Sequence, residues 1–200
     1  MRVSIRRPLS GLLLATLLFA FFQLAIAAVP DGWQPIGRSM DANGINNSSN
    51  LAKLPKGALG PSGDLFVVWE EQLSPTRQEV FLLRWNGSSL AEVAGSASHG
   101  GVSNQNELAE NPVVAVDSQG RILVAWDARE EIGTFQVYTR RFTGGQWQAI
   151  QDVSDTPSDS LHPQVAFSPN DVPHIVWQEE TLIATNVMAK RFTHGAWEEL

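Results

Sequence analysis

The chain has 200 residues, of which 43% are hydrophobic, and it carries 21 acidic side chains against 14 basic ones. This length allows one ordinary domain with a real core, and seven tryptophans argue against disorder. The acidic balance disfavours a nucleic-acid partner, because phosphate binding needs a basic surface. There is no cysteine, so the fold does without disulfides.

The N-terminal segment has the features of an export signal. Three arginines precede an apolar run over residues 11–27, and the run ends in Ala25-Ile26-Ala27, a small-x-small cleavage pattern. We therefore expect a signal peptide at 1–27 and a secreted or cell-envelope mature chain at 28–200. The run approaches the ~18 residues that can cross a bilayer, so an uncleaved membrane anchor is the alternative.

Three copies of one sequence unit follow. Each copy begins with proline, has a turn in its middle and ends in two apolar residues and a tryptophan, at residues 55–69, 112–126 and 163–177. A basic-aromatic pair follows each copy, beginning at Arg84, Arg141 and Arg191. Matches at this many positions indicate duplication of a structural unit.

Alternation and turn residues predict four strands in the middle copy, at residues 113–116, 122–126, 135–142 and 147–153. An acidic loop is expected at 127–133. Four short antiparallel strands in ~50 residues are typical of a β-propeller blade. An immunoglobulin-type sandwich is the alternative for a single unit, but it would not explain three copies on one spacing.

We therefore predict an all-β protein made of propeller blades, each with four antiparallel strands. The predicted repeats lie at about 54–95, 111–153 and 162–200, with an extra leading strand at 33–39. Propellers close with about four to eight blades. Three blades cannot close a ring, so we expect the remaining blades to come from a longer chain or from self-association.

The strand, Asp-x-x-Gly turn and Val-x-Trp pattern, followed by Arg-aromatic-turn-Trp, resembles the tandem propeller repeats of secreted bacterial proteins described as sialidase-like. The resemblance covers nearly the whole mature chain and implies an extracellular propeller. True sialidases carry Asp boxes, in which Trp follows Gly by three residues. Here Trp69 and Trp126 follow Gly63 and Gly120 by six, so the Asp boxes are absent and no catalytic residue is carried over.

The residues fixed in every copy are expected to be structural. The tryptophans that close the second strand, Trp69, Trp126 and Trp177, are predicted to pack between neighbouring blades rather than to bind a ligand. The repeated arginines are predicted to share one structural task in the same way. A function is therefore expected in the variable segments between the repeated positions.

In a four-stranded blade, the loop between the second and third strands and the loop into the next blade emerge on one face. Residues just before each leading proline should lie nearest the axis of the ring. The candidate binding residues on this acidic and amide-rich face are Glu70, Glu71, Asn104, Asn106, Asn111, Asp127, Arg129, Glu130, His162 and Glu179. Carboxylates and amides of this kind suit sugar hydroxyls or a hard cation.

Catalytic and metal-binding motifs are missing from the sequence. The four histidines show no ligand spacing, and there is no Gly-x-Ser-x-Gly or cysteine nucleophile. We expect no cofactor, no metal and no catalytic residue. We favour an exported, non-catalytic recognition or scaffolding propeller that binds carbohydrate or another envelope protein, with a fragment of a sialidase-like or other glycoside hydrolase as the alternative.

Overall fold

The computed structural model describes residues 32, 34–105, 107–129 and 132–200. The chain divides into two units, Met1–Gln34 and Pro35–Leu200, and all strands lie in the second. The expected signal peptide at 1–27 lies outside the described residues. No helix within the described ranges is long and apolar enough to cross a membrane.

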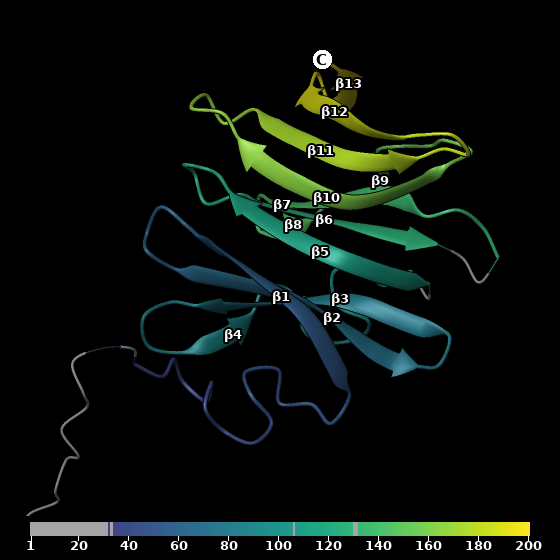
Figure 1. Cartoon of the computed structure of the whole chain (residues 1–200). Helices are drawn as coiled ribbons and strands as arrows, with labels where there is room; N and C mark the ends of the chain where they lie inside the picture. Colours follow the sequence, from purple (N-terminus) through teal and green to yellow (C-terminus); the bar gives the residue numbers. More distant parts are fainter. Residues whose placement is uncertain (1–31, 33, 106, 130–131) are drawn as a thin grey trace, which may run out of the picture. The chain divides into compact units, whose positions relative to one another are not determined.

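The strands form three antiparallel blades, as predicted (Figure 1). The first blade consists of β1 (Leu51–Leu59), β2 (Leu65–Ser74), β3 (Arg77–Trp85) and β4 (Leu90–Glu92). The second consists of β5 (Leu108–Val116), β6 (Ile122–Arg129), β7 (Gln136–Thr143), β8 (Gln146–Trp147) and β9 (Gln151–Asp152). The third consists of β10 (Asp159–Phe167), β11 (Pro173–Glu180), β12 (Thr185–Thr193) and β13 (Ala196–Glu199).

Within each blade, consecutive strands pair as an up-and-down meander. The first strands of the blades, β1, β5 and β10, lie side by side, with β5 between the other two. A single parallel bridge from Gln78 to Leu108 connects the first blade to the second. These features confirm the all-β propeller prediction, and the three described blades do not close a ring.

The structure corrects four local predictions. Each blade begins three residues before its predicted start, because the first strand continues on the far side of its proline. The fourth strand of the second blade is broken into β8 and β9 by residues 148–150, which lie outside the regular pairing although the N–H of Gln148 still donates to the carbonyl of Arg141 in β7 (2.8 Å). Residues 127–129 belong to β6 rather than to a loop, because their ladder with β7 and β5 continues past Trp126.

The fourth correction concerns the leading strand expected at 33–39: residues 34–36 have no regular secondary structure and residues 37–39 form a turn. The N–H of Ser39 donates to the carbonyl of Ile36 (2.9 Å), and Ser39 Oγ accepts the N–H of Ile36 (2.9 Å). Arg38 donates to the carbonyl of Ile45 (2.9 Å). Local bonds therefore replace the ladder that a strand would need.

A bulge interrupts each first strand at its proline. The register shifts between Lys53 and Lys56, between Glu110 and Val113, and between Leu161 and Gln164. The residue before each proline is left-handed, with φ of 48° at Leu54, 51° at Asn111 and 54° at His162. A bulge tolerates proline because it leaves one residue out of the ladder. The sequence feature X-Pro thus marks the bulge rather than the strand start.

The tryptophans that close the second strands are all buried. Their exposed fractions are 5% for Trp69, 0% for Trp126 and 4% for Trp177. Trp126 and Trp177 pack between neighbouring blades as predicted, whereas Trp69 packs with residues of its own blade and with Ile45 of the preceding segment. Trp126 joins a core shared by the first two blades, and Trp177 joins a core shared by the last two. Each fully buried large apolar side chain contributes about 1.5–3 kcal/mol, so these cores hold the blades together.

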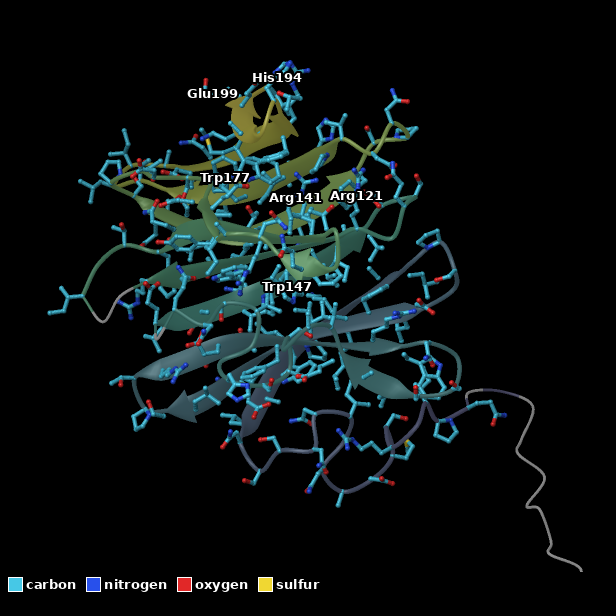
Figure 2. All side chains as sticks on the ribbon, turned by 180° about the vertical axis from the view of Figure 1, so that it is seen from behind. Arg121, Arg141, Trp147, Trp177, His194 and Glu199 are labelled. Carbon is cyan, nitrogen blue, oxygen red and sulfur yellow. The ribbon has the colours of Figure 1, made fainter. Side chains whose placement is uncertain are left out.

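Outer tryptophans also link neighbouring blades. Trp147 Nε1 donates to the carbonyl of Val93 in the preceding blade (2.8 Å), and Trp197 Nε1 donates to Thr139 Oγ1 (3.0 Å). Figure 2 shows Trp147 near the boundary of the first two blades and Trp177 near that of the last two. The links repeat because the outer strand occupies the same place in each blade.

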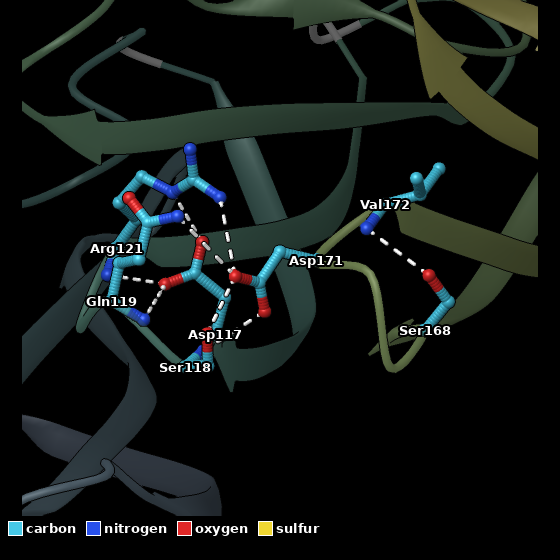
Figure 3. Close-up of polar contacts among 7 residues, drawn as sticks. All are labelled: Asp117, Ser118, Gln119, Arg121, Ser168, Asp171 and Val172. Carbon is cyan, nitrogen blue, oxygen red and sulfur yellow. Dashed lines mark hydrogen bonds and ion pairs between the residues drawn. The ribbon is translucent and has the colours of Figure 1, made fainter.

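The turns between the first and second strands of the last two blades make a further link (Figure 3). Asp171 accepts bonds from the N–H and Oγ of Ser118 (3.0 and 2.6 Å), and Arg121 pairs with both Asp117 and Asp171. Asp117 in turn caps its own turn by accepting the N–H of Gln119 (2.9 Å). This contact joins the β5–β6 and β10–β11 turns at the exposed rim.

Candidate functional site

Four of the residues proposed from the sequence meet where the first strands lie side by side. We name Glu70, Asn111, Asp127 and His162 the axial cluster. Glu70 and Asp127 each follow the closing tryptophan of a second strand, and Asn111 and His162 each occupy the bulge of the next blade's first strand. The bulge turns the backbone N–H away from its own ladder and toward the preceding blade.

The axial cluster is held by hydrogen bonds between blades. The N–H of Asn111 donates to Glu70 Oε2 (2.9 Å), and the N–H of His162 donates to Asp127 Oδ1 (3.0 Å). Asn111 Nδ2 also donates to Asp127 Oδ2 (3.1 Å). A non-glycine residue in the left-handed region costs about 1–2 kcal/mol, and a hydrogen bond to a charged group contributes about 1.5–3 kcal/mol. The carboxylate therefore offsets the strain of the bulge that it binds.

Burial changes the acid–base behaviour of both carboxyl groups. Glu70 is 3% exposed and Asp127 is fully buried. Desolvation raises the pKa of Asp127 to about 7, against the lowering effect of the bonds from Asn111 and His162. Desolvation likewise raises the pKa of Glu70, with a smaller contribution from Glu110. Burial thus moves the titration of Asp127 toward neutral pH.

A small cavity of about 110 Å³ opens beside the axial cluster. Its lining combines residues of all three first strands: Leu54, Lys56, Asn111, Val113, His162, Pro163 and Gln164. Lys56, His162 and Gln164 are exposed and carry donors and acceptors, whereas the two buried carboxylates are not part of this lining. The accessible chemistry is therefore that of hydrogen bonding by ammonium, imidazole and amide groups.

Sequence reasoning missed five of the seven lining residues: Leu54, Lys56, Val113, Pro163 and Gln164. The repeat could have found them, because Leu54 precedes Pro55 just as Asn111 and His162 precede their own prolines. Lys56 and Gln164 directly follow prolines of the same repeat position. They lie in first strands, whereas the binding face was expected in acidic and amide-rich loops.

Glu71 and Glu179 lie in β2 and β11 rather than in loops, and each binds its own blade's tryptophan. Trp69 Nε1 donates to Glu71 Oε2 and Trp177 Nε1 donates to Glu179 Oε2, both at 3.0 Å. Burial alone would raise the pKa of Glu71, but bonds from Ser48, Trp69, Asn50 and Asn46 together lower it. Both carboxylates therefore satisfy buried indoles and take no place in the axial cluster.

The remaining predicted residues are dispersed. Asn104 is an exposed, left-handed turn residue with φ of 41°. Arg129 stacks over the ring of Phe135 at 4.9 Å, and its buried Nε has no hydrogen-bond partner. Asn106 and Glu130 lie outside the described residues. No group of three or more potential ligands among the described residues could hold a metal ion.

Larger hollows lie away from the axis. One, of about 560 Å³, lies beside Glu71 between residues 46–49 and 97–100. Another, of about 340 Å³, lies where Arg141 stacks over Phe192 at 4.6 Å, between the outer strands of the last two blades. Neither contains a member of the axial cluster.

Comparison with solved structures shows the fold that the chain shares. An endo-arabinase from Bacteroides thetaiotaomicron is 12% identical over 75% of this chain and 59% of its own, with a TM-score of 0.50. An alpha-L-arabinanase from Penicillium chrysogenum, solved with arabinobiose, is 13% identical over 68% of this chain and 44% of its own, also at 0.50. A fucose lectin from Kordia zhangzhouensis, solved with methyl-fucoside, is 14% identical over 72% of this chain and 96% of its own, with a TM-score of 0.45.

At these identities the likeness to the two enzymes is one of fold, and it supports the propeller architecture. The chain spans 59% and 44% of the lengths of the two arabinan-degrading enzymes. No protein-family model matches the sequence, and no curated protein matches it.

Proposed function

We propose that this chain is part of an exported β-propeller that recognises carbohydrate at its axial face without cleaving it. The observation that carries this proposal is the engagement of both axial carboxylates. Glu70 and Asp127 are buried, and each accepts a backbone N–H from the next blade. Carboxylates held in this way link neighbouring blades, and neither lines the axial cavity, whereas glycoside hydrolysis needs a pair of carboxyl groups that face the substrate.

The exposed groups beside these carboxylates suit recognition. Lys56, His162 and Gln164 offer donors and acceptors around an apolar floor that includes Leu54 and Val113. Sugar sites combine a few directed hydrogen bonds with apolar contact to the ring. The propeller-type enzyme from Penicillium chrysogenum was solved with arabinobiose, so an arabinose-containing oligosaccharide is the first ligand to test.

Export is part of the proposal. It rests on the basic residues, the apolar run and the small residues of the N-terminal segment. N-terminal sequencing of the protein recovered outside the cytoplasm is expected to begin at Ala28. Recovery of the intact N-terminus in the membrane fraction would instead indicate an anchor.

The binding proposal is tested by a glycan array followed by isothermal titration calorimetry with arabinobiose and with acidic sugars. Substituting His162→Ala together with Gln164→Ala is expected to weaken binding about tenfold or more, because each lost hydrogen bond is worth about 0.5–1.5 kcal/mol. Gln146→Ala, at an exposed position in the outer strand β8, is the matched control and should bind as the parent does. Equal loss in both variants, or no binding to any glycan, would overturn the proposal.

A second candidate function follows from the burial of Asp127, which is 0% exposed and whose pKa desolvation raises to about 7. A carboxyl that is protonated near neutral pH is suited to act as a general acid, as in a sialidase-like or other glycoside hydrolase propeller. This function predicts release of reducing sugar that Asp127→Asn abolishes. Binding without such release supports recognition alone.

A further inference from the structure

In each of the first two blades, the following blade buries certain positions on one face of the sheet. The equivalent positions of the third blade are exposed. Val80 and Val137 are paired with the residues after the closing tryptophans, and both are fully buried. Val187 occupies the same place opposite Gln178 and is 82% exposed. The repeat therefore places an interface residue on an uncovered surface.

A second position shows the same contrast. The residue before the closing tryptophan is fully buried at Val68 and Ala125, but Val176 is 39% exposed. In the β11–β12 ladder, Val176 pairs with Ala189 and Gln178 pairs with Val187. Residues two apart in a strand point to the same face, so Val176 and Val187 lie on the same side of the third blade. Together they form what we name the open face of the third blade.

In the closed interfaces, backbone bonds from the following segment hold this position. The N–H of Val102 donates to the carbonyl of Val80 (2.6 Å), and the N–H of Val80 donates to Ser103 Oγ (2.8 Å). The second interface repeats both bonds between Val137 and the pair Val153 and Ser154, at 2.8 and 2.9 Å. An apolar residue followed by a short polar one is thus the counterpart of each interface valine.

The segment before the first blade carries the same counterpart. Ile45 and Asn46 stand where Val102 and Ser103 stand in the next repeat. The residue that follows is left-handed in all three segments, with φ of 51° at Asn47, 41° at Asn104 and 43° at Asp155. Ile45 packs on the Trp69 cluster as Val102 packs in the Trp126 core.

The hydrogen bonds of the axial cluster indicate a second contact that the segment before the first blade can make. Leu54 has the left-handed bulge conformation of Asn111 and His162, whose N–H groups bind Glu70 and Asp127. The corresponding acceptor position in the third blade is Gln178, whose amide oxygen can accept the N–H of a bulge residue. Residues 45–54 are therefore complementary to the open face at two separate contacts.

We propose that the open face receives residues 45–54 of a second copy of this chain, head to tail. Two copies related by a two-fold axis then make this contact twice and form a ring of six blades. Six lies within the range of about four to eight blades in which propellers close. The axial cavity is completed in this ring, because each copy contributes its own first strands.

Sedimentation equilibrium of the purified chain tests the proposal, with twice the monomer mass as the expected result. Val187→Glu is expected to weaken the dimer about 100-fold or more, because docking would bury an unpaired charge. It should leave the monomer folded, since the side chain is 82% exposed there. The matched control is Ile132→Glu, which alters a 91% exposed residue outside the third blade and should leave the dimer intact.

Cross-linking tests the orientation. The chain contains no cysteine, so a short thiol cross-linker joins only introduced sites. A mixture of Leu54→Cys chains with Gln178→Cys chains is expected to give cross-linked dimers, and neither variant should do so alone. Cross-linking of Gln178→Cys chains alone would show face-to-face pairing and overturn the head-to-tail arrangement.

A monomeric chain would overturn the proposal, as would a dimer equally stable in Val187→Glu and Ile132→Glu. A monomer would leave the open face to blades of a longer chain. None of these measurements needs a sugar, so their failure is distinguishable from failure of the carbohydrate proposal.

Discussion

The substitution Asp127→Asn separates the structural role of this carboxyl from its charge. The introduced amide keeps an oxygen that can accept the N–H of His162. Its NH₂ group would face Asn111 Nδ2, but a flip of the Asn111 amide turns an oxygen toward it and restores the bond. The variant should therefore fold with the same links between blades.

The expected effect follows from the pKa of Asp127, which rises from 3.8 to about 7 because the carboxyl is buried. The folded state then holds the proton more tightly than the unfolded chain does. The free energy of unfolding therefore falls as the pH rises from about 4 to about 7 and is unaffected by this group above that range. Each pH unit within the range is worth at most about 1.4 kcal/mol, so Asp127 should lower stability by about 2 kcal/mol between pH 5 and pH 7.

Urea unfolding of both proteins at pH 5, 6 and 7 measures this difference. The parent chain is expected to lose stability relative to Asp127→Asn as the pH rises, with the gap changing by about 2 kcal/mol. Equilibrium curves that stay parallel across the three pH values would refute the assignment of a raised pKa. A parent chain that gains stability relative to the variant would refute its sign.

Three further outcomes are expected in the same unfolding assay. Glu179→Ala should cost about 1–3 kcal/mol, because the buried indole of Trp177 loses its acceptor at 3.0 Å. Trp126→Ala should cost about 3–5 kcal/mol, since the side chain is fully buried between blades. Gly101→Ala should destabilise by more than about 1 kcal/mol, because φ is +68° and a Cβ would lie 2.2 Å from the Val80 carbonyl oxygen, whereas the open position Gly133→Ala should have no effect. Equal stability of the two glycine variants would contradict the last expectation.

The blades could be predicted because their signals are local. Period-2 alternation, a turn and a closing tryptophan recur in each copy, so the strands and the burial of Trp69, Trp126 and Trp177 followed from the sequence. The predicted strand starts were wrong because proline cannot donate to a ladder, and it was taken as a boundary. The bulge that accommodates proline depends on pairing with the second strand, which no local pattern displays.

The axial cluster could be predicted only in part. Repeat position placed Asn111 and His162 near the axis, and the structure brings both to Glu70 and Asp127. No local pattern indicated that the carboxyl groups would be buried. Asp127 was predicted to lie in an acidic loop. It accepts a hydrogen bond from the next blade instead, because β6 continues to Arg129.

The amino-acid sequence by itself determined the repeat, the four-strand unit and the residues that pack between units, since each depends on spacing along one segment. Tertiary structure alone decided which polar groups remain accessible. Asp127 is buried because the bulge of the next blade docks on it, and Val187 is exposed because no described segment docks there. Such differences among equivalent positions arise from contacts between blades, which the sequence of a single blade does not encode.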